Sequence, residues 1–291
     1  MAPNRWTVII ATDGSPQARA AVETAVVFPW PPNSNAQGIL ARGTPVLTDA
    51  TTAVWEALRD AARADARRAS RRLRRRWPDA EVTLTDAPPV PAILGLARKR
   101  RARAIVLGSR GLGAVGRLLL GSVSRAVVRR APCPVLVVRR RARAARRFLI
   151  GIDGSPHARD AVALVASLTL PRGGQVRLLR VVEALRPPST GLMPAHLRAL
   201  VAREAASAER ERVAAASREL DIARARLARA GWRVKTEVRI GRPLRELLDA
   251  SRNADVLVVG ARGIGAVERL LLGSVAEGAV THAAVPVLVV R

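Results

Sequence analysis

The sequence GARGIGAVERLLLGS at Gly260–Ser274 decides the fold, because it repeats the sequence GSRGLGAVGRLLLGS at Gly108–Ser122. Each copy has a glycine, two residues, a second glycine, nine residues and then Gly-Ser. Each follows a short apolar run, at 256–259 and 104–107, that is typical of a buried strand. A strand, a glycine-rich turn and an apolar helical pattern together predict an α/β unit that the chain contains twice.

The glycines of each copy also favour an anion site. Because glycine has no Cβ, the backbone at these positions can point its N–H groups toward an anion, and a ligand can approach it closely. Ser122 and Ser274 stand where we expect the N-caps of the next helices, and unpaired N–H groups and the helix dipole favour a phosphate there. Two tight turns with helix caps and no ligand are the alternative. Two copies with identical spacing favour the phosphate site.

A second pair of turns supports the repeat. Asp13-Gly14-Ser15-Pro16 ends the apolar run 6–12, and Asp153-Gly154-Ser155-Pro156 ends the run 148–152. Each turn predicts a helix start, with serine as the cap and proline at the first helical position. The aspartates either close the turn or present a carboxylate at the carboxyl edge of a parallel sheet, where open α/β folds bind ligands.

The spacing of the two pairs indicates a duplicated domain. Asp153 follows Asp13 by 140 residues, and Gly260 follows Gly108 by 152. One zone of insertion fits a duplication better than a solenoid. Alternating strands and helices predict an α/β fold of two tandem doubly wound domains, each with a five-stranded parallel sheet. We expect the domains at 1–138 and 148–291, with an Arg-rich solvated linker at 139–147.

Within the zone of insertion, the second half has the clearer pattern. It predicts a strand at 175–182, a long helix at 192–230 and a strand at 232–240. The first half predicts a loop at 28–35, a weak glycine-containing strand at 37–43, a helix at 51–77 and a strand at 81–85.

The composition indicates a large aliphatic core and a basic surface. The chain has 291 residues, of which 49% are hydrophobic and only 2% aromatic, and its net charge is +27. Residues 1–147 hold 28 basic and 9 acidic residues, so the positive charge is concentrated in the first half. Such a charge favours polyanions, but arginines on solvated helix faces, as the runs 67–76 and 98–103 suggest, are the simpler explanation. Few aromatic residues are available for base stacking, which disfavours single-strand binding.

The remaining features suggest an ordinary cytoplasmic protein. The single cysteine, Cys133, excludes an intrachain disulfide and precedes an apolar strand, so we expect it in the core. The first residues carry no signal-peptide pattern, and no apolar run is long enough to span a membrane.

These motifs resemble those of the universal stress protein family in its tandem two-domain form. The resemblance covers almost the whole chain and includes the Asp-Gly-Ser turns, both glycine-rich motifs and the closing ProValLeuValVal at 134–138 and 286–290. It implies a Rossmann-like, adenine-nucleotide α-hydrolase-like fold. Complete motifs are typical of the branch that binds ATP, often with Mg²⁺, and acts in stress regulation. The halves would then form an internal pseudo-dimer, with a possible homodimer and a protein partner still to be identified.

The resemblance also assigns roles to residues. Asp13 and Asp153 match the acidic residue near the adenine–ribose end or the metal, and the glycine-rich motifs match the ribose and phosphate cradle. The adenine contact falls near Val181 in the second half and near Gly43 in the first. The full expected binding set is Asp13, Gly14, Gly108, Ser109, Arg110, Gly111, Gly113, Gly121, Ser122, Val123, Asp153, Gly154, Val181, Gly260, Ala261, Arg262, Gly263, Gly265, Gly273, Ser274 and Val275.

Three hypotheses for function remain open. The first is an ATP-binding regulator with one site in each half and little or no hydrolysis, since the three histidines share no motif and only the aspartates are placed to serve a reaction. The second is a nucleotide-free interaction module. It is motivated by Ala87, which stands where the second half has Gly241, and by Arg103, which stands where it has Asp255. The third is a polyanion or nucleic-acid binder, which the sequence does not favour.

Overall fold

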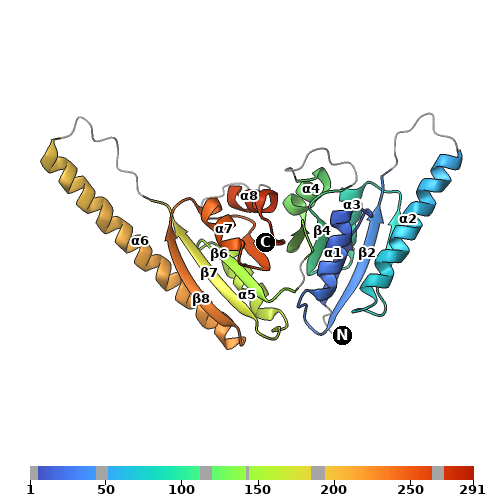
Figure 1. The fold of residues 1–291 in the computed structure, drawn as a ribbon, viewed down its shortest axis with the longest axis horizontal. Helices are drawn as coiled ribbons and strands as arrows, with labels where there is room; N and C mark the ends of the chain where they lie inside the picture. Colours follow the sequence, from blue (N-terminus) through green and yellow to red (C-terminus); the bar gives the residue numbers. More distant parts are fainter. Residues whose placement is uncertain (1–5, 44–51, 112–119, 142–143, 185–193, 264–271) are drawn as a thin grey trace.

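The computed structural model describes residues 6–43, 52–111, 120–141, 144–184, 194–263 and 272–291, and it shows two α/β halves of the same layout (Figure 1). The first half contains β1 (Trp6–Ala11), α1 (Pro16–Val27), β2 (Ser34–Ala41), α2 (Thr52–Leu73), β3 (Val82–Thr85), α3 (Pro89–Lys99), β4 (Ala104–Gly108), α4 (Ser122–Arg130) and β5 (Val135–Val138). The second contains β6 (Arg147–Ile152), α5 (Pro156–Ser167), β7 (Gln175–Val182), α6 (Ala195–Arg229), β8 (Arg233–Ile240), α7 (Pro243–Ser251), β9 (Val256–Gly260), α8 (Ser274–His282) and β10 (Val287–Val290).

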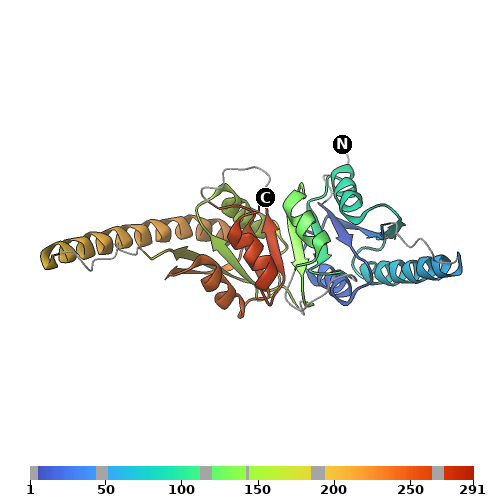
Figure 2. The ribbon, with the colours of Figure 1, turned by 90° about the horizontal axis from the view of Figure 1, so that it is seen from above.

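The two halves share one ten-stranded sheet in the order β3-β2-β1-β4-β5-β10-β9-β6-β7-β8. Within each half all strand pairs are parallel, which confirms the predicted fold class. At the centre β5 pairs with β10 in antiparallel register, with Leu136 opposite Leu288. The last strands of the two halves therefore join the halves edge to edge, and α4 and α8 lie side by side over this seam (Figure 2).

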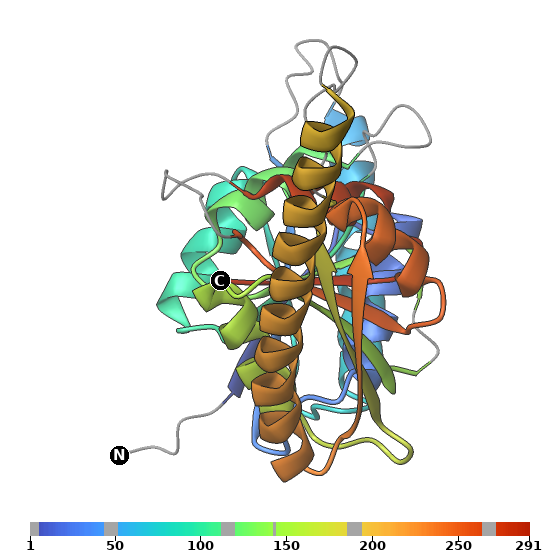
Figure 3. The same cartoon turned by 90° about the vertical axis from the view of Figure 1, so that its left-hand side faces the viewer.

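The helices cover both faces of the sheet. On one face α1, α2, α5 and α6 pack on strand residues such as Val8 and Ile10, and on the other α3, α4, α7 and α8 pack on residues such as Ile9. This alternation follows from the period of two along a strand. Each core extends through both halves, and the long α6 lies over the outer strands, with its first turns extending past them (Figure 3).

A chain of aromatic rings crosses the seam on the α1–α5 face. Phe28 stacks near Trp30, with ring centroids 4.2 Å apart, and meets Phe148 edge-on at 5.9 Å. Phe148 in turn contacts Trp232 at 5.4 Å. The expected loop at 28–35 is therefore only partly correct, because Phe28 and Trp30 are buried and Ser34 already begins β2.

Strand β2 is longer than its glycine suggests. It spans eight residues, as does β7, so the expectation of a weak strand at 37–43 is wrong in extent and position. Gly38 lies opposite Val82 in the parallel register, and a Cβ on Gly38 would overlap the Val82 side chain. Glycine here makes room for a neighbouring strand's side chain and does not interrupt the strand.

The long helices also end differently from the prediction. Helix α2 ends at Leu73, before the predicted Trp77, and α6 covers Ala195–Arg229 of the predicted 192–230, of which 192 and 193 lie outside the described residues. Arg76, expected on a solvated helix face, donates to the carbonyls of Phe28 (2.7 Å) and Trp30 (3.0 Å), and burial lowers its pKa.

Two arginines cross the seam in opposite directions. Arg139, after β5, donates to the carbonyl of Thr281 in α8, and Arg291, after β10, donates to the carbonyls of Val128 (2.9 Å) and Arg129 at the end of α4. Each satisfies orphan carbonyls at a helix C-terminus, where the dipole favours a cation. The solvated-linker interpretation of 139–147 is therefore wrong for Arg139.

Truncating these arginines should loosen the seam. We expect Arg139→Ala and Arg291→Ala each to lower the free energy of unfolding by about 1–2 kcal/mol, since a charge-assisted hydrogen bond is lost and helix carbonyls lose their donor. The exposed Arg140 provides the matched control, and Arg140→Ala should change the free energy of unfolding by under about 0.5 kcal/mol. Urea unfolding followed by circular dichroism checks this, and equal effects for all three variants would contradict it.

Cys133 lies in the core, as predicted. Burial raises the pKa of its thiol from 9.0 to about 12, although the Arg291 charge opposes the shift. Because the thiolate is the reactive form, at pH 8 the native chain holds about 1000-fold less of it than the unfolded chain. We therefore expect alkylation by iodoacetamide to be at least about 100-fold slower for native protein than in urea. Comparable rates in the two conditions would show that the thiol is accessible.

Candidate functional site

In each half, the turn after the first strand is built by a serine cap and an aspartate. The Ser15 hydroxyl accepts from the N–H of Ala18 (3.2 Å), with Pro16 in the first helical turn, and Asp13 Oδ1 accepts from the N–H of Ser15 (3.0 Å). Ser155 and Asp153 repeat both contacts at 3.1 and 3.0 Å. The predicted helix starts are confirmed, and one carboxylate oxygen of each aspartate closes its turn.

The same serines tie this turn to the glycine-rich turn. The Ser15 hydroxyl donates to the carbonyl of Arg110 (3.3 Å), and the Ser155 hydroxyl donates to that of Arg262 (3.2 Å). A Cβ on Gly111 would overlap Asp13 Oδ2, and one on Gly263 would lie 2.7 Å from Asp153 Oδ2. The second glycine of each motif therefore lets the aspartate carboxylate lie against the loop backbone.

The first glycine of each motif has a packing role. A Cβ on Gly108 would lie 2.8 Å from the backbone N of Ala18, and one on Gly260 would lie 2.9 Å from the Cβ of His157. Both glycines let the first turn of α1 or α5 pack directly on the strand end. Close approach of a ligand, the reason expected from the sequence, is thus not needed to explain them, although both also lie on a cavity wall.

The third glycine, and not the following serine, occupies the N-cap. Gly121 and Gly273 are the cap residues, with ψ of 150° and 148°, and Ser122 and Ser274 are the first helical residues. The prediction of serine caps is wrong, because the glycine carbonyls accept the first helical hydrogen bonds: Gly121 accepts from the N–H of Arg125 and Gly273 from that of Glu277, both at 2.9 Å. The first N–H groups of α4 and α8 still have no partner within their helix.

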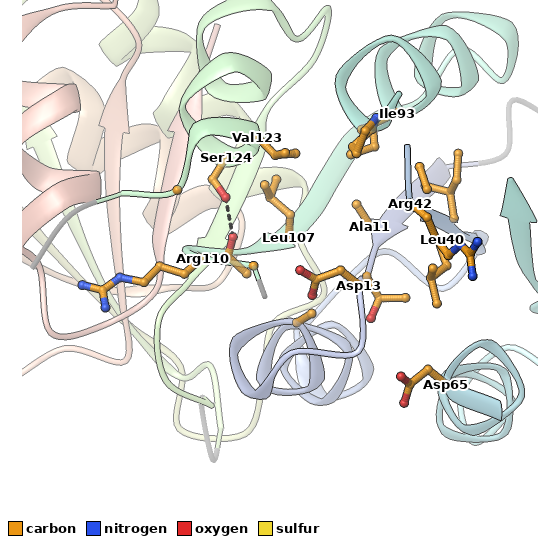
Figure 4. Close-up of a pocket in the computed structure, with 18 of the residues that line it drawn as sticks. Ala11, Asp13, Leu40, Arg42, Asp65, Ile93, Leu107, Arg110, Val123 and Ser124 are labelled. Carbon is orange, nitrogen blue, oxygen red and sulfur yellow. Dashed lines mark hydrogen bonds between the residues drawn. The ribbon is translucent and has the colours of Figure 1, made fainter. Parts of the chain in front are cut away.

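These elements enclose a cavity of about 480 Å³ in the first half. Its wall includes seven residues of the expected set: Asp13, Gly108, Arg110, Gly111, Gly121, Ser122 and Val123. Asp13 lies between the end of β4 and Asp65 of α2, whereas the Arg110 side chain extends away from Asp13 toward the second half (Figure 4). Ser124 fixes the start of α4 by donating to the Gly108 carbonyl (2.7 Å).

A larger cavity, of about 780 Å³, occupies the same place in the second half. Its wall includes seven residues of the expected set: Asp153, Val181, Gly260, Gly263, Gly273, Ser274 and Val275. Glu219 and Arg180, which form an ion pair at 3.3 Å, also line it.

The other expected residues lie elsewhere. Gly14, Ser109, Gly154, Ala261 and Arg262 belong to the two turns but are not part of either wall. Ser109 and Ala261 are buried beneath the turns, and a Cβ on Gly14 would overlap Asp65, so these positions shape the site from behind. Gly113 and Gly265 lie outside the described residues.

The structure adds residues that sequence reasoning missed. Asp65 of α2 and Glu219 of α6 each face the first turn of their half, and their distance from that turn in sequence left no signal. The strand register also corrects the adenine position in the first half. Ile39 pairs with Ala11, as Leu179 pairs with Gly151 two residues before the aspartate, so the counterpart of Val181 is Ala41 and not Gly43.

The two sites differ at their rims. Arg42 lines the first cavity and pairs with Asp86 at 3.4 Å, whereas the second half has Val182 at the matching place. Beside the second site, burial and the charge of Arg262 lower the pKa of His157, which keeps this imidazole neutral at pH 7. His157 is not on the wall of the cavity.

Comparison with known proteins supports the relationship that the motifs suggested. The model of the universal stress protein family matches residues 5–139 and again 144–291. A universal stress protein of Mycobacterium tuberculosis is 35% identical over 225 residues, covering 72% of this chain and 68% of that protein. One of Mycolicibacterium smegmatis is 33% identical over 208 residues, covering 66% of this chain and 63% of its own length.

Solved structures show the same fold over the whole chain. A universal stress protein from Archaeoglobus fulgidus superposes with a TM-score of 0.65 at 21% identity, covering 98% of this chain and 96% of its own. A protein of unknown function from Pseudomonas aeruginosa gives a TM-score of 0.56 at 15% identity, covering 99% and 92%. Among the described residues, no helix is both long and apolar enough to cross a membrane. With both halves matched by the family model, the chain belongs to the universal stress protein family.

Proposed function

We propose that the protein is a regulator that binds one adenine nucleotide, ATP, in each half. One observation supports this most directly. In each half, an aspartate, a helix N-terminus and the apolar end of the second strand all line the same cavity. Both cavities have the size of ordinary small-molecule sites, roughly 300–1,000 Å³. The nucleotide-bound state would alter contacts with a protein partner or a second copy of the chain.

The proposed orientation follows from the chemistry of the walls. Phosphates would lie at the first turn of α4 or α8, where N–H groups and the helix dipole favour an anion. The base would lie at the opposite end, against Val181, Pro243 and Leu247 in the second half, with Ala41, Pro89 and Ile93 in the equivalent places of the first. The larger second cavity, without an Arg42–Asp86 pair at its rim, is the stronger candidate.

Magnesium fits this site only together with the nucleotide. In the part of the chain that the structure describes, no group of three His, Cys, Asp or Glu side chains could hold a metal ion. Mg²⁺ commonly uses one or two carboxylates plus substrate phosphates, and Asp13 or Asp153 could supply such a carboxylate. Bound Mg²⁺ would neutralise phosphate charge.

We infer slow or absent hydrolysis. One carboxylate oxygen of each aspartate accepts a hydrogen bond from its own turn, and His157 lies off the wall. No histidine lines either cavity among the described residues. Phosphoryl transfer to water needs a group that positions the water, in addition to a phosphate cradle.

A proline at the first helical position tests the phosphate cradle. Proline removes one N–H but fits the start of a helix, and the φ and ψ of Gly273 (−65°, 148°) suit a residue that precedes proline. We expect Ser274→Pro to weaken ATP binding about 10-fold or more at the second site, since a charge-assisted hydrogen bond is lost. Ser122→Pro should do the same at the first, and titration calorimetry measures both.

The matched controls are Ser274→Ala and Ser122→Ala, which keep the backbone N–H and should bind within about 3-fold of wild type. Two binding events, each weakened by its own proline, are expected. An ATP affinity unchanged by both proline substitutions would contradict the proposed phosphate site at the starts of α4 and α8. Absence of any ATP binding by the folded wild type would instead support a nucleotide-free interaction module.

The aspartates should couple ATP binding to magnesium. Asp153→Asn keeps an oxygen that can accept from Ser155, so the turn is retained while the charge is lost. We expect Mg²⁺ to strengthen ATP binding at the second site of the wild type. In Asp153→Asn this strengthening should be about 10-fold smaller. Calorimetry with and without Mg²⁺ measures this, and an unchanged Mg²⁺ effect would place the ion away from Asp153.

A further inference from the structure

The last turn of α3 and the turn that joins α3 to β4 are rich in cations. Their five cationic residues, which we call the basic turn, are Arg98, Lys99, Arg100, Arg101 and Arg103, and all five are exposed. Within the described residues, no ion pair joins any of them to a carboxylate. On α2, by contrast, Arg63, Arg68 and Arg72 each pair with an acidic side chain.

The second half shows that the fold does not require these charges. The N–H of Arg103 donates to the Thr7 carbonyl, as the N–H of Asp255 donates to that of Arg147, so the two turns lead into β4 and β9 in the same way. Counted from Pro89 and Pro243, which begin α3 and α7, Arg98 and Lys99 correspond to Arg252 and Asn253. Arg103 corresponds to Asp255, and Arg100 and Arg101 are two extra residues of the first half. The first half thus has five cations where the second half has one cation and one anion, and that anion, Asp255, is paired with Arg147 at 2.8 Å.

The backbone of the basic turn holds an arginine where glycine is usual. Arg101 has a φ of +47°, and it is the one non-glycine residue with positive φ in the described part of the chain. The N–H of Ala102 donates to the Ala97 carbonyl (2.8 Å) and that of Arg101 to the Arg98 carbonyl (3.0 Å), the pattern of a Schellman motif. Helix α6 closes with the same pattern but has Gly231, at φ +87°, in this place. An arginine in this strained conformation suggests a role for its side chain.

We infer that the basic turn contacts the phosphate backbone of duplex nucleic acid, without reading its sequence. Four of its five cations are arginines, whose planar guanidinium matches phosphate oxygens in a bidentate manner. The turn has no aromatic residue for stacking on a single strand. None of the large hydrophobic side chains exposed in the described structure belongs to it, so it lacks the apolar groups that insert into a membrane interface.

This surface is separate from the proposed nucleotide site. The basic turn precedes β4 and Gly108 ends it, so the turn and the first cavity lie at opposite ends of a five-residue strand, about 16 Å apart. Duplex binding would leave the cavity accessible. The proposal therefore goes beyond the ATP site and does not depend on it.

The test compares two triple variants of equal charge. Arg98→Ala, Arg100→Ala and Arg103→Ala combined remove three charges of the basic turn, and Arg203→Ala, Arg210→Ala and Arg218→Ala combined remove three exposed arginines of α6. Binding of a fluorescent DNA duplex is followed by anisotropy over a range of KCl concentrations. Each lost phosphate contact lowers the slope of log K against log salt by about 0.9. We expect the slope to fall by about 3 for the basic turn and by less than about 1 for α6.

Arg101→Gly separates function from folding. Glycine relieves the positive φ, so this variant should unfold at a higher urea concentration than wild type while binding the duplex several-fold more weakly. Equal slopes for the two triple variants would show diffuse attraction by the net charge and would overturn the proposal. So would unchanged duplex binding by the basic-turn variant combined with weaker binding to phosphatidylserine vesicles, which would indicate a membrane surface.

Discussion

The antiparallel pairing of β5 with β10 is the constraint on which the rest of the structure depends. It makes one sheet from two half-sheets, removes two exposed edges and sets α4 beside α8. Between β2 and β7 the sheet has seven strand steps, and a twist of about 20–25° at each nearly cancels the reversal at the seam. The strands that lead toward α2 and α6 therefore point to the same side of the molecule (Figure 1).

The seam also connects each cavity with the opposite half. Helix α4 begins at the first cavity and ends at carbonyls held by Arg291, and α8 begins at the second cavity and ends at a carbonyl held by Arg139. Anything that shifts one of these helices along its axis must therefore act on a residue of the other half. The motif glycines limit such a shift, since Gly121 packs on the turn at Arg110 and Gly273 on that at Arg262.

Local chemistry made most of the fold predictable from the sequence. The strands at 104–107 and 256–259, the caps at Ser15 and Ser155 and the buried Cys133 all depend on neighbours within a few residues or on apolar periodicity. The errors arose where a distant contact decides the outcome. Gly38 belongs to a strand because Val82 fills its space, and Arg139 leaves the solvent because a helix from the other half ends beside it.

The site was predictable to the same extent and for the same reason. The motif located the turns around Asp13 and Gly111, but Asp65 comes from a helix whose position only the packed structure determines. The spacing of the motif also could not show which glycine packs on a helix, which contacts the aspartate and which caps the next helix.

The duplication explains why the two halves could diverge. Residues that hold the seam or close the turns, such as Ser15 and Ser155 or Arg139 and Arg291, are the same in both halves, because each makes a contact that its partner half also needs. Positions outside these contacts are free of that constraint, and there the halves differ: Arg42 against Val182 at the cavity rim, and Arg103 against Asp255 before the fourth strand of each half. A duplicated fold can thus keep one architecture while its halves present different surfaces and different cavities. The differences between equivalent positions, more than the shared motif, are where separate functions of the two halves should be sought.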